Sequence, residues 1–353
     1  MFESFGFENV TAPQVTVFFA LAIGLAFGGL AERTAFCLRS ALVGPNRRNA
    51  SGVWLIALAV ALIGTQIAVQ AGLISFADHR YMASDLPLGA LVLGGTLFGI
   101  GMVLTRGCAS RLTVLTGTGN LRAFLVMLVF AFVAHATLKG VLAPVRVWIN
   151  SFTVPLESAA LPGPALFWTV VIALASLVFA LRSGTRPSRL LLAALLGALV
   201  PLAWVGTGYV LYDDFDPVTF ESLAFTAPAA DSLFYGIASS AISANFGVGL
   251  IGGVILGSLV MALLFGSFQW QSFETPAQTG RYLLGGTFMG FGGVLAGGCT
   301  VGAGLSGIPT LTITALVAIS AIIAGALAAN RVLNASASGS DAPSTTPPLQ
   351  PAE

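Results

Sequence analysis

Two stretches of nearly the same sequence decide the fold of this chain: LGGTLFGIGMVLTRGC at residues 93–108 and LGGTFMGFGGVLAGGC at residues 284–299. Aligned without gaps at an offset of 191 residues, the spacing of Cys108 and Cys299, they are identical at 10 of 16 positions. The chain contains only three cysteines, so a matched pair of them is hard to ascribe to chance. The alignment therefore predicts an internal duplication.

The composition places these repeats in a membrane. Of the 353 residues, 56% are hydrophobic and only 8% are charged, and the mean hydropathy is +0.92. A soluble domain of this size needs about 25% charged residues to cover its surface. The charges nearly cancel, with 15 basic and 14 acidic residues, so there is no basic face for a nucleic acid. The expected surroundings are the lipid bilayer.

Apolar runs predict an all-α polytopic membrane protein, because a spanning helix needs roughly 20 mostly apolar residues. The two repeats fall in the third and eighth runs, which cross the membrane in opposite directions. This predicts an inverted pseudo-two-fold repeat with a substrate site near its axis. The glycine-rich segment 244–257 is expected to be the inverted counterpart of the first helix. About nine transmembrane helices are expected, at 13–30, 53–74, 87–105, 122–143, 165–181, 190–206, 246–266, 282–296 and 310–330.

The basic residues predict the orientation, because they mark the cytoplasmic side of a membrane protein. Their distribution favours a periplasmic N-terminus and a cytoplasmic C-terminus. One side receives Arg33, Arg39, Arg47, Arg48, Arg106, Arg111, Arg122, Arg182, Arg186, Arg189, Arg281 and Arg331, and the other only Arg80, Lys139 and Arg146.

These predictions divide the chain into four parts. Residues 1–12 form a periplasmic N-terminus, 13–181 the first membrane half and 182–333 the second. Residues 334–353 are rich in Ser, Ala, Thr and Pro, a composition typical of a disordered tail, which would be cytoplasmic.

All three cysteines share one local pattern of helix, break, cysteine and short helix. The third, Cys37, lies in GGLAERTAFCLRSAL at residues 28–42. After Cys108 and Cys299 come segments 109–119 and 300–309, which are too short and polar to span and are expected to be re-entrant short helices. Free N–H groups at such helix starts favour an anion, by about 0.3–1 kcal/mol per contact. A thiol adds a weak S–H donor and a soft sulfur, which suits an anion with a terminal sulfur or selenium.

The expected site is a substrate site with no catalytic residue, cofactor or metal. Two distant histidines make a poor metal site. The competing hypothesis is a membrane sulfurtransferase that forms a Cys persulfide, which is the weaker one because no His or Lys accompanies a cysteine. The expected substrate-binding residues are Cys37, Cys108, Cys299, Gly107, Gly298, Ser110 and Thr300, together with Arg111 and Arg39, whose positions the charge asymmetry across the membrane also explains.

The two repeats, the segment AERTAFCLRSAL at residues 31–42 and GGCTVGAGLSG at 297–307 resemble the YeeE/YedE family of bacterial inner-membrane proteins. The resemblance extends from about Phe19 to Ala329. It implies a permease that takes up thiosulfate into the cytoplasm, with the three cysteine thiols passing the ion along by S–H contacts. It also implies a separate cytoplasmic sulfurtransferase of the TusA type as acceptor. A selenium compound stays open as the substrate, as does the oligomeric state.

Overall fold

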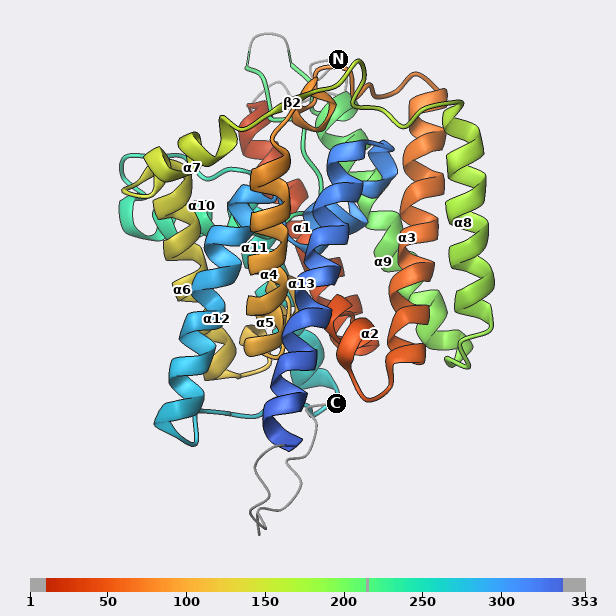
Figure 1. Cartoon of the computed structure of the whole chain (residues 1–353). Helices are drawn as coiled ribbons and strands as arrows, with labels where there is room; N and C mark the ends of the chain where they lie inside the picture. Colours follow the sequence, from red (N-terminus) through yellow and green to blue (C-terminus); the bar gives the residue numbers. More distant parts are fainter. Residues whose placement is uncertain (1–10, 214–215, 339–353) are drawn as a thin grey trace.

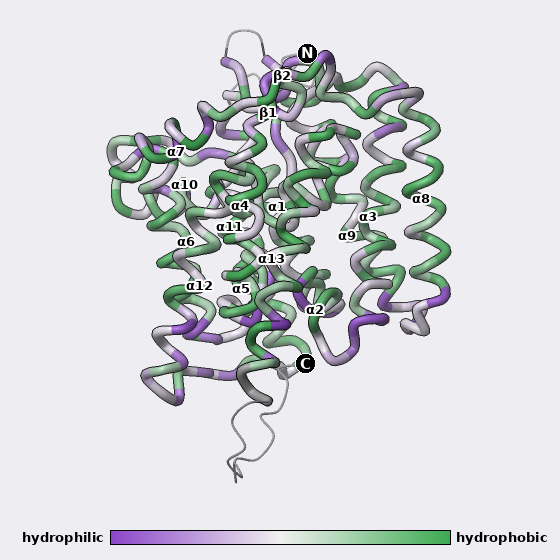
Figure 2. Tube along the Cα trace, in the orientation of Figure 1, coloured by the Kyte–Doolittle hydropathy of each residue, from purple (hydrophilic) through white to green (hydrophobic). Residues whose placement is uncertain are grey.

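Long apolar helices running between two polar ends make up the structure (Figure 1, Figure 2). The computed structural model describes residues 11–213 and 216–338. The fold class is all-α, as predicted, with one antiparallel pair of two-residue strands among the described residues. The elements are α1 (Ala12–Thr34), α2 (Leu38–Val43), α3 (Arg47–Gln70), η2 (Arg80–Met82), β1 (Asp85–Leu86), α4 (Leu88–Leu104), α5 (Ala109–Gly117), α6 (Leu121–Lys139), α7 (Ala143–Asn150), β2 (Val154–Pro155), α8 (Ala165–Leu181), α9 (Pro187–Val205), η3 (Gly206–Val210), α10 (Thr226–Ala238), α11 (Phe246–Leu264), α12 (Pro276–Leu295), η4 (Thr300–Leu305), η5 (Ile308–Thr310) and α13 (Ile313–Ser338).

Eight helices in the described part of the chain are long and apolar enough to cross a membrane. The remaining expected span, 165–181, is α8, which has 17 residues and packs against α3. That length is at the lower limit of the roughly 17–25 residues that a span requires. Short helices follow Cys108 and Cys299, as predicted: α5 after the first, and the π-helical η4 after the second.

Polar side chains at the helix starts satisfy backbone groups that the helices leave unpaired. Asn120 Oδ1 accepts a hydrogen bond of 3.0 Å from the N–H of Ala123 at the start of α6. Asn245 does the same for Val248 at the start of α11, at 3.1 Å. Such caps stabilise a helix by about 1 kcal/mol and mark where each helix begins.

The two repeat helices α4 and α12 cross with their backbones in contact. A methyl group placed on Gly292 would lie 2.5 Å from the carbonyl oxygen of Gly94. One placed on Gly101 would lie 2.5 Å from the carbonyl oxygen of Gly285. The start of each helix therefore meets the end of the other, so the helices are antiparallel. The contacts are also reciprocal, because Gly94 and Gly285 are equivalent in the repeat, as are Gly101 and Gly292.

The glycines of α11 pack against α1 in a different way. Gly249 lies against the carbonyl of Val17, and Gly257 lies two turns further along against that of Leu25. Residue numbers rise together along both helices, so α1 and α11 are parallel. Inverted copies run in opposite directions, and the expectation that 244–257 is the inverted counterpart of the first helix was therefore wrong.

The helix–helix contacts divide the bundle into two groups with the same packing pattern. The first group is α1, α3, α4 and α6, and the corresponding helices of the second are α9, α11, α12 and α13. Helix α1 packs on α11, and α9 packs on α3. Helix α4 packs on α13, and α12 packs on α6. The short helices follow the same scheme, since α2 contacts α3 and α13 while α10 contacts α11 and α6. Helix α8 stands outside the scheme and links the two groups.

The predicted tail begins inside a helix. Helix α13 continues to Ser338, so the expectation of a disordered segment from residue 334 was wrong for its first residues. Asn334 to Ser338 include two alanines, which favour a helix. The rest of that segment, 339–353, lies outside the described residues, as does most of the expected N-terminal part, 1–10.

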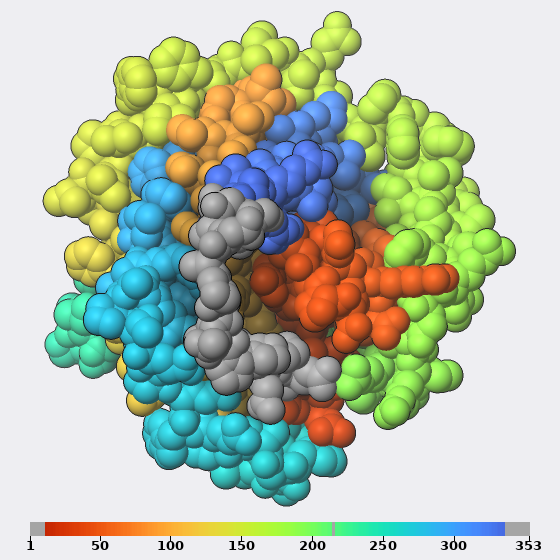
Figure 3. Space-filling model, turned by 60° about the horizontal axis from the view of Figure 1, so that its bottom comes forward, coloured from red at the N-terminus to blue at the C-terminus, as the bar shows by residue number. Residues whose placement is uncertain are grey.

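Basic residues gather at one end of the bundle, here called the basic end. There Arg48 Nη2 donates a hydrogen bond to the carbonyl of Arg182, at 2.6 Å. The guanidinium of Arg33 stacks 3.8 Å from the ring centroid of Phe265. Figure 3 looks onto this end, where α2 and the start of α3 lie between α12 and the connection from α8 to α9. That it faces the cytoplasm stays a prediction.

Gly292→Ala tests the α4–α12 crossing. The added methyl group meets backbone atoms that cannot rotate away, and such overpacking costs about 1–3 kcal/mol. We expect a clear fall in the thermal unfolding midpoint of the detergent-solubilised protein. Gly280→Ala in the same helix is the matched control, because a methyl group there meets nothing within 4 Å. Equal midpoints for the two variants would show that the crossing is not tight.

Glu221→Gln tests a carboxyl group at the end opposite to the basic one. Burial, and then the charge of Asp231, raise the pKa of Glu221 from 4.5 to about 7, and Arg80 opposes this rise. The folded protein then binds the proton more tightly than the unfolded chain, so stability is lost as pH rises from about 4.5 to about 7. We expect the unfolding midpoint of the wild type to fall relative to Glu221→Gln across this range.

The matched control for that measurement is Glu274→Gln, which alters an exposed carboxyl group. Parallel pH profiles for the wild type and Glu221→Gln would contradict the prediction.

Candidate functional site

Each of the three cysteines is the residue immediately before a short helix. Cys37 precedes α2, Cys108 precedes α5 and Cys299 precedes η4, all with extended backbone. Two positions before each cysteine, the chain leaves the preceding helix through a left-handed residue. The φ angles there are 53° at Ala35, 58° at Arg106 and 69° at Gly297.

The same left-handed turn ends the helix before each of the three cysteines and so positions its thiol. Glycine adopts this conformation without strain, whereas a residue with a Cβ is disfavoured by roughly 1–2 kcal/mol. Gly297 meets the requirement directly, and Ala35 and Arg106 tolerate it. The pattern of helix, break, cysteine and short helix is therefore confirmed, and its backbone geometry is the same in the loosely matching Cys37 segment.

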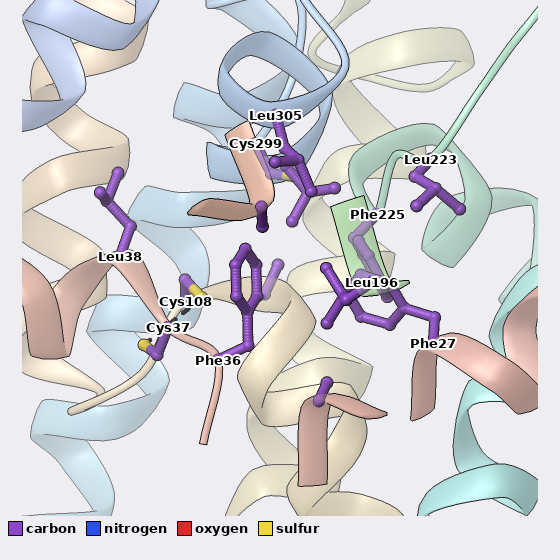
Figure 4. Close-up of a cluster of buried hydrophobic side chains, with 14 of the residues drawn as sticks. Phe27, Phe36, Cys37, Leu38, Cys108, Leu196, Leu223, Phe225, Cys299 and Leu305 are labelled. Carbon is purple, nitrogen blue, oxygen red and sulfur yellow. Dashed lines mark hydrogen bonds between the residues drawn. The ribbon is translucent and has the colours of Figure 1, made fainter. Parts of the chain in front are cut away.

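Cys37 and Cys108 form a pair of free thiols, called here the thiol pair. Their Sγ atoms lie 3.6 Å apart, within hydrogen-bond distance for sulfur. The Oγ of Ser110 lies 3.3 Å from the Cys108 sulfur. The two cysteines are only 3% and 1% exposed. The breaks after α1 and α4 meet here, so residues 71 positions apart in sequence share one site (Figure 4).

Cys299 occupies a second, separate setting, called here the Cys299 cradle. The residue is completely buried. Its sulfur accepts a hydrogen bond of 3.4 Å from the N–H of Gly302, and the N–H groups of Val301 and Phe225 also interact with it. Converging backbone N–H groups of this kind favour negative charge.

Two buried threonine hydroxyls lie beside the cradle without a partner. Within residues 11–213 and 216–338, Thr300 Oγ1 and Thr226 Oγ1 have no hydrogen-bond partner. Leaving a buried polar group unpaired costs about 1–3 kcal/mol. Thr300 directly follows Cys299, and Thr226 directly follows Phe225. The Thr226 hydroxyl faces Gly293 of α12, whereas Thr300, next to Cys299 in the chain, offers the nearer free donor.

The segment 223–226 is a part of the site that sequence reasoning missed. Leu223 and Phe225 are completely buried, and the carbonyl of Leu223 accepts a hydrogen bond of 2.7 Å from Ser306 Oγ. Phe225 precedes α10 as Cys37 precedes α2. It carries no thiol, so no cysteine pattern marks it, and the acidic residues before it suggested only an outer loop. The one available signal was the apolar run Leu-Ala-Phe at 223–225, which follows the acidic stretch.

The two glycines before the repeat cysteines differ in how strictly they are needed. A methyl group on Gly298 would lie 2.9 Å from the N of Ala303 and 3.3 Å from Tyr81 Oη. On Gly107 it would meet the end of the Leu112 side chain at 3.2 Å, and that side chain can adjust. Gly298 therefore lets the backbone close over Cys299, while Gly107 is less constrained.

Arg39 and Arg111 bring positive charge to the thiol pair from the basic end. Both guanidinium groups interact electrostatically with Cys37. Arg111 Nη1 donates to the carbonyl of Ala31 at 3.5 Å. Arg39 Nε is buried and has no hydrogen-bond partner in the described part of the chain. A buried cationic donor without an acceptor is suited to receiving an anion.

The structure brings together Cys37, Cys108, Ser110, Arg39 and Arg111, and it groups Cys299, Gly298 and Thr300 elsewhere. Among the described residues no hydrogen bond joins Cys299 to either thiol of the pair. No group of three or more His, Cys, Asp or Glu in that part of the chain could hold a metal ion.

A cavity opens near the Cys299 cradle at the end opposite to the basic one. Its volume is about 610 Å³, and the loop after α3 and the residues before α8 line it. Thr310 and Leu311, which follow η4 in the chain, form part of its wall. The Tyr81 hydroxyl, from the same outer loop, donates to the carbonyl of Gly297 at 3.1 Å. The Tyr81 hydroxyl also donates to the carbonyl of Gly302 at 3.3 Å, so Tyr81 covers the cradle on the side of this loop.

Comparison of the sequence with known proteins identifies the family of this chain. Residues 33–328 match the sulphur transport family. The chain is 29% identical over 321 residues to the thiosulfate transporter TsuA of Spirochaeta thermophila, covering 84% of this chain and 93% of that protein. It is 26% identical over 317 residues to the thiosulfate transporter TsuA of Escherichia coli K12, covering 81% and 85%.

Proposed function

The chain belongs to the sulphur transport family, a family of membrane transporters and not of enzymes, and from this premise we propose that it takes up thiosulfate into the cytoplasm. The single observation that carries the proposal is the presence of three buried, free thiols at helix starts, with unpaired polar groups beside them. The two relatives named thiosulfate transporters support the choice of anion.

The two ends of thiosulfate differ, and the two kinds of group around Cys299 suit them. The terminal sulfur is soft and polarizable, as is a thiol, and accepts an S–H contact. The oxygens are harder acceptors and fit N–H and hydroxyl donors. Gly302 N–H and the free hydroxyl of Thr300 are such donors. Sulfate has no soft end and gains nothing from the thiol.

The proposed path runs from the Cys299 cradle to the thiol pair and then to the basic end. The thiols pass the ion by S–H contacts, so no bond within thiosulfate is broken and no electron is transferred. Arg39 and Arg111 attract the ion as it reaches Cys37. By the positive-inside rule the basic end is cytoplasmic, the N-terminus is periplasmic and the direction is inward. A separate TusA-like sulfurtransferase is the proposed acceptor on that side.

We also infer that the two membrane halves are inverted copies, with α8 as the link between them. The reciprocal glycine contacts of α4 and α12 support this inference, as do the matching neighbours of the two groups of helices. On this scheme the counterpart of Cys108 is Cys299, and the counterpart of Cys37 is Phe225. The inner half-site then has two thiols and the outer half-site has one.

Replacement of each cysteine by alanine tests the proposal. We expect uptake of labelled thiosulfate into proteoliposomes to fall at least tenfold for Cys37→Ala, Cys108→Ala and Cys299→Ala, because each removes an S–H donor from the path. Ser176→Ala, which alters a buried side chain of α8, is the matched control and should retain uptake.

Uptake that survives all three cysteine replacements would overturn the relay. A cysteine that gains one sulfur atom in mass after turnover would instead indicate persulfide chemistry. Competition by selenite that exceeds competition by unlabelled thiosulfate would assign the chain to selenium transport.

A further inference from the structure

Three aromatic rings in successive contact join the residue next to the thiol pair to the Cys299 cradle. Phe36 packs edge-on against Phe27, with ring centroids 6.2 Å apart. Phe27 in turn packs against Phe225, with centroids 5.3 Å apart. Phe36 is the neighbour of Cys37 in the chain, and the Phe225 N–H interacts with Cys299. The rings therefore connect the two half-sites by direct contacts.

These rings form a closed apolar layer, called here the aromatic seal. Phe36 is 2% exposed, and Phe27 and Phe225 are completely buried. Figure 4 shows the Phe36 ring pointing away from the thiol pair toward Cys299 and Leu305, with Leu196 drawn between Phe36 and Phe225 and Leu223 beyond Phe225. All belong to one buried hydrophobic cluster. A hydrated anion cannot cross such a layer without losing its water, so the seal blocks the path as it stands.

Phe36 is the member of the seal that lies in a break between two helices. Phe27 lies within α1, and the carbonyl of Phe225, the residue before α10, accepts a hydrogen bond of 3.3 Å from the N–H of Ala229. Phe36 instead lies in the break between α1 and α2, directly after the left-handed Ala35. Its backbone is tied to α1 through one hydrogen bond, from its N–H to the carbonyl of Ala31 at 3.2 Å. A small change in the break would swing its ring.

The duplication scheme also sets Phe36 apart. Its counterpart in the second half is Ala224, which precedes Phe225 as Phe36 precedes Cys37. Ala224 lies against the Gly302 turn and places no ring in the path. The movable barrier is therefore present on the inner half-site only, next to the two-thiol position.

We propose that Phe36 is the gate between the Cys299 cradle and the thiol pair, and that it makes passage selective for an anion with a soft, weakly hydrated sulfur end. The inference rests on the proposed transport function. The ring edge carries partial positive charge and tolerates a polarizable sulfur, whereas the oxygens of sulfate keep their water and are held back. Because Phe36 and Cys37 are adjacent, displacement of the ring accompanies arrival at the thiol pair.

Thiol accessibility tests the gate without requiring transport. In a Cys299→Ser background, the only thiols left are those of the thiol pair. A membrane-impermeant maleimide is added from the side opposite to the basic end of oriented proteoliposomes. We expect Phe36→Ala to label at least tenfold faster than the background protein. Phe130→Ala is the matched control, since it removes an equally buried ring from α6, outside the seal. It should label at the background rate.

Anion selectivity is the second readout, in proteins that retain all three cysteines. We expect Phe36→Ala to lower the ratio of thiosulfate to sulfate uptake at least tenfold, and Phe36→Trp to slow thiosulfate uptake. Phe36→Leu keeps most of the volume without the ring, and it replaces Phe36→Ala under the same criteria if that variant does not fold.

The experiments distinguish a failure of the gate from a failure of the proposed transport function. Labelling of Phe36→Ala at the rate of Phe130→Ala, with an unchanged selectivity ratio, would overturn the gate. A wild type that carries no thiosulfate would overturn the proposed function, and the labelling experiment would still decide whether Phe36 separates the two half-sites.

Discussion

Backbone contact between α4 and α12 is the constraint on which the other features depend. Glycines at the crossing leave room for the opposing backbone, so the two helices approach until a methyl group would touch a carbonyl oxygen. An antiparallel crossing this close sends the end of α4 toward the basic end and the end of α12 the other way. Cys108 and Cys299, which follow those ends, are therefore presented from opposite sides of one narrow core.

The polar groups near the thiols have a shared origin in the broken helices. Each left-handed turn stops a helix inside the bundle and exposes N–H groups of the next short helix to the protein interior. Lipid cannot satisfy such groups, so they are buried in protein, as the Gly302 N–H is against the Cys299 sulfur. The unpaired hydroxyls of Thr300 and Thr226 and the unpaired Nε of Arg39 belong to the same set, among the described residues. An anion that moves through the bundle finds donors where the helices are interrupted.

The two half-sites are alike in the helices that form them and unlike in their side chains, and on the proposed path this difference favours one direction. The position before α2 holds Cys37, and the matching position before α10 holds Phe225. The inner half-site consequently has paired thiols and nearby arginines, while the outer has one thiol and a ring of the aromatic seal. On the proposed path, an anion that leaves the Cys299 cradle for the thiol pair meets more soft donors and more positive charge.

The sequence by itself determined the membrane class, the helical fold, most of the spans and the cysteine pattern, because hydropathy, glycine spacing and a repeated motif are local properties. It did not determine which helices are neighbours. The parallel packing of α1 on α11, the pairing of Cys37 with Cys108, and the arrival of Phe225 at Cys299 join segments far apart in the chain. Those contacts depend on how the two halves pack together, and a phenylalanine in place of a cysteine leaves no motif to find. Only the tertiary structure decided them.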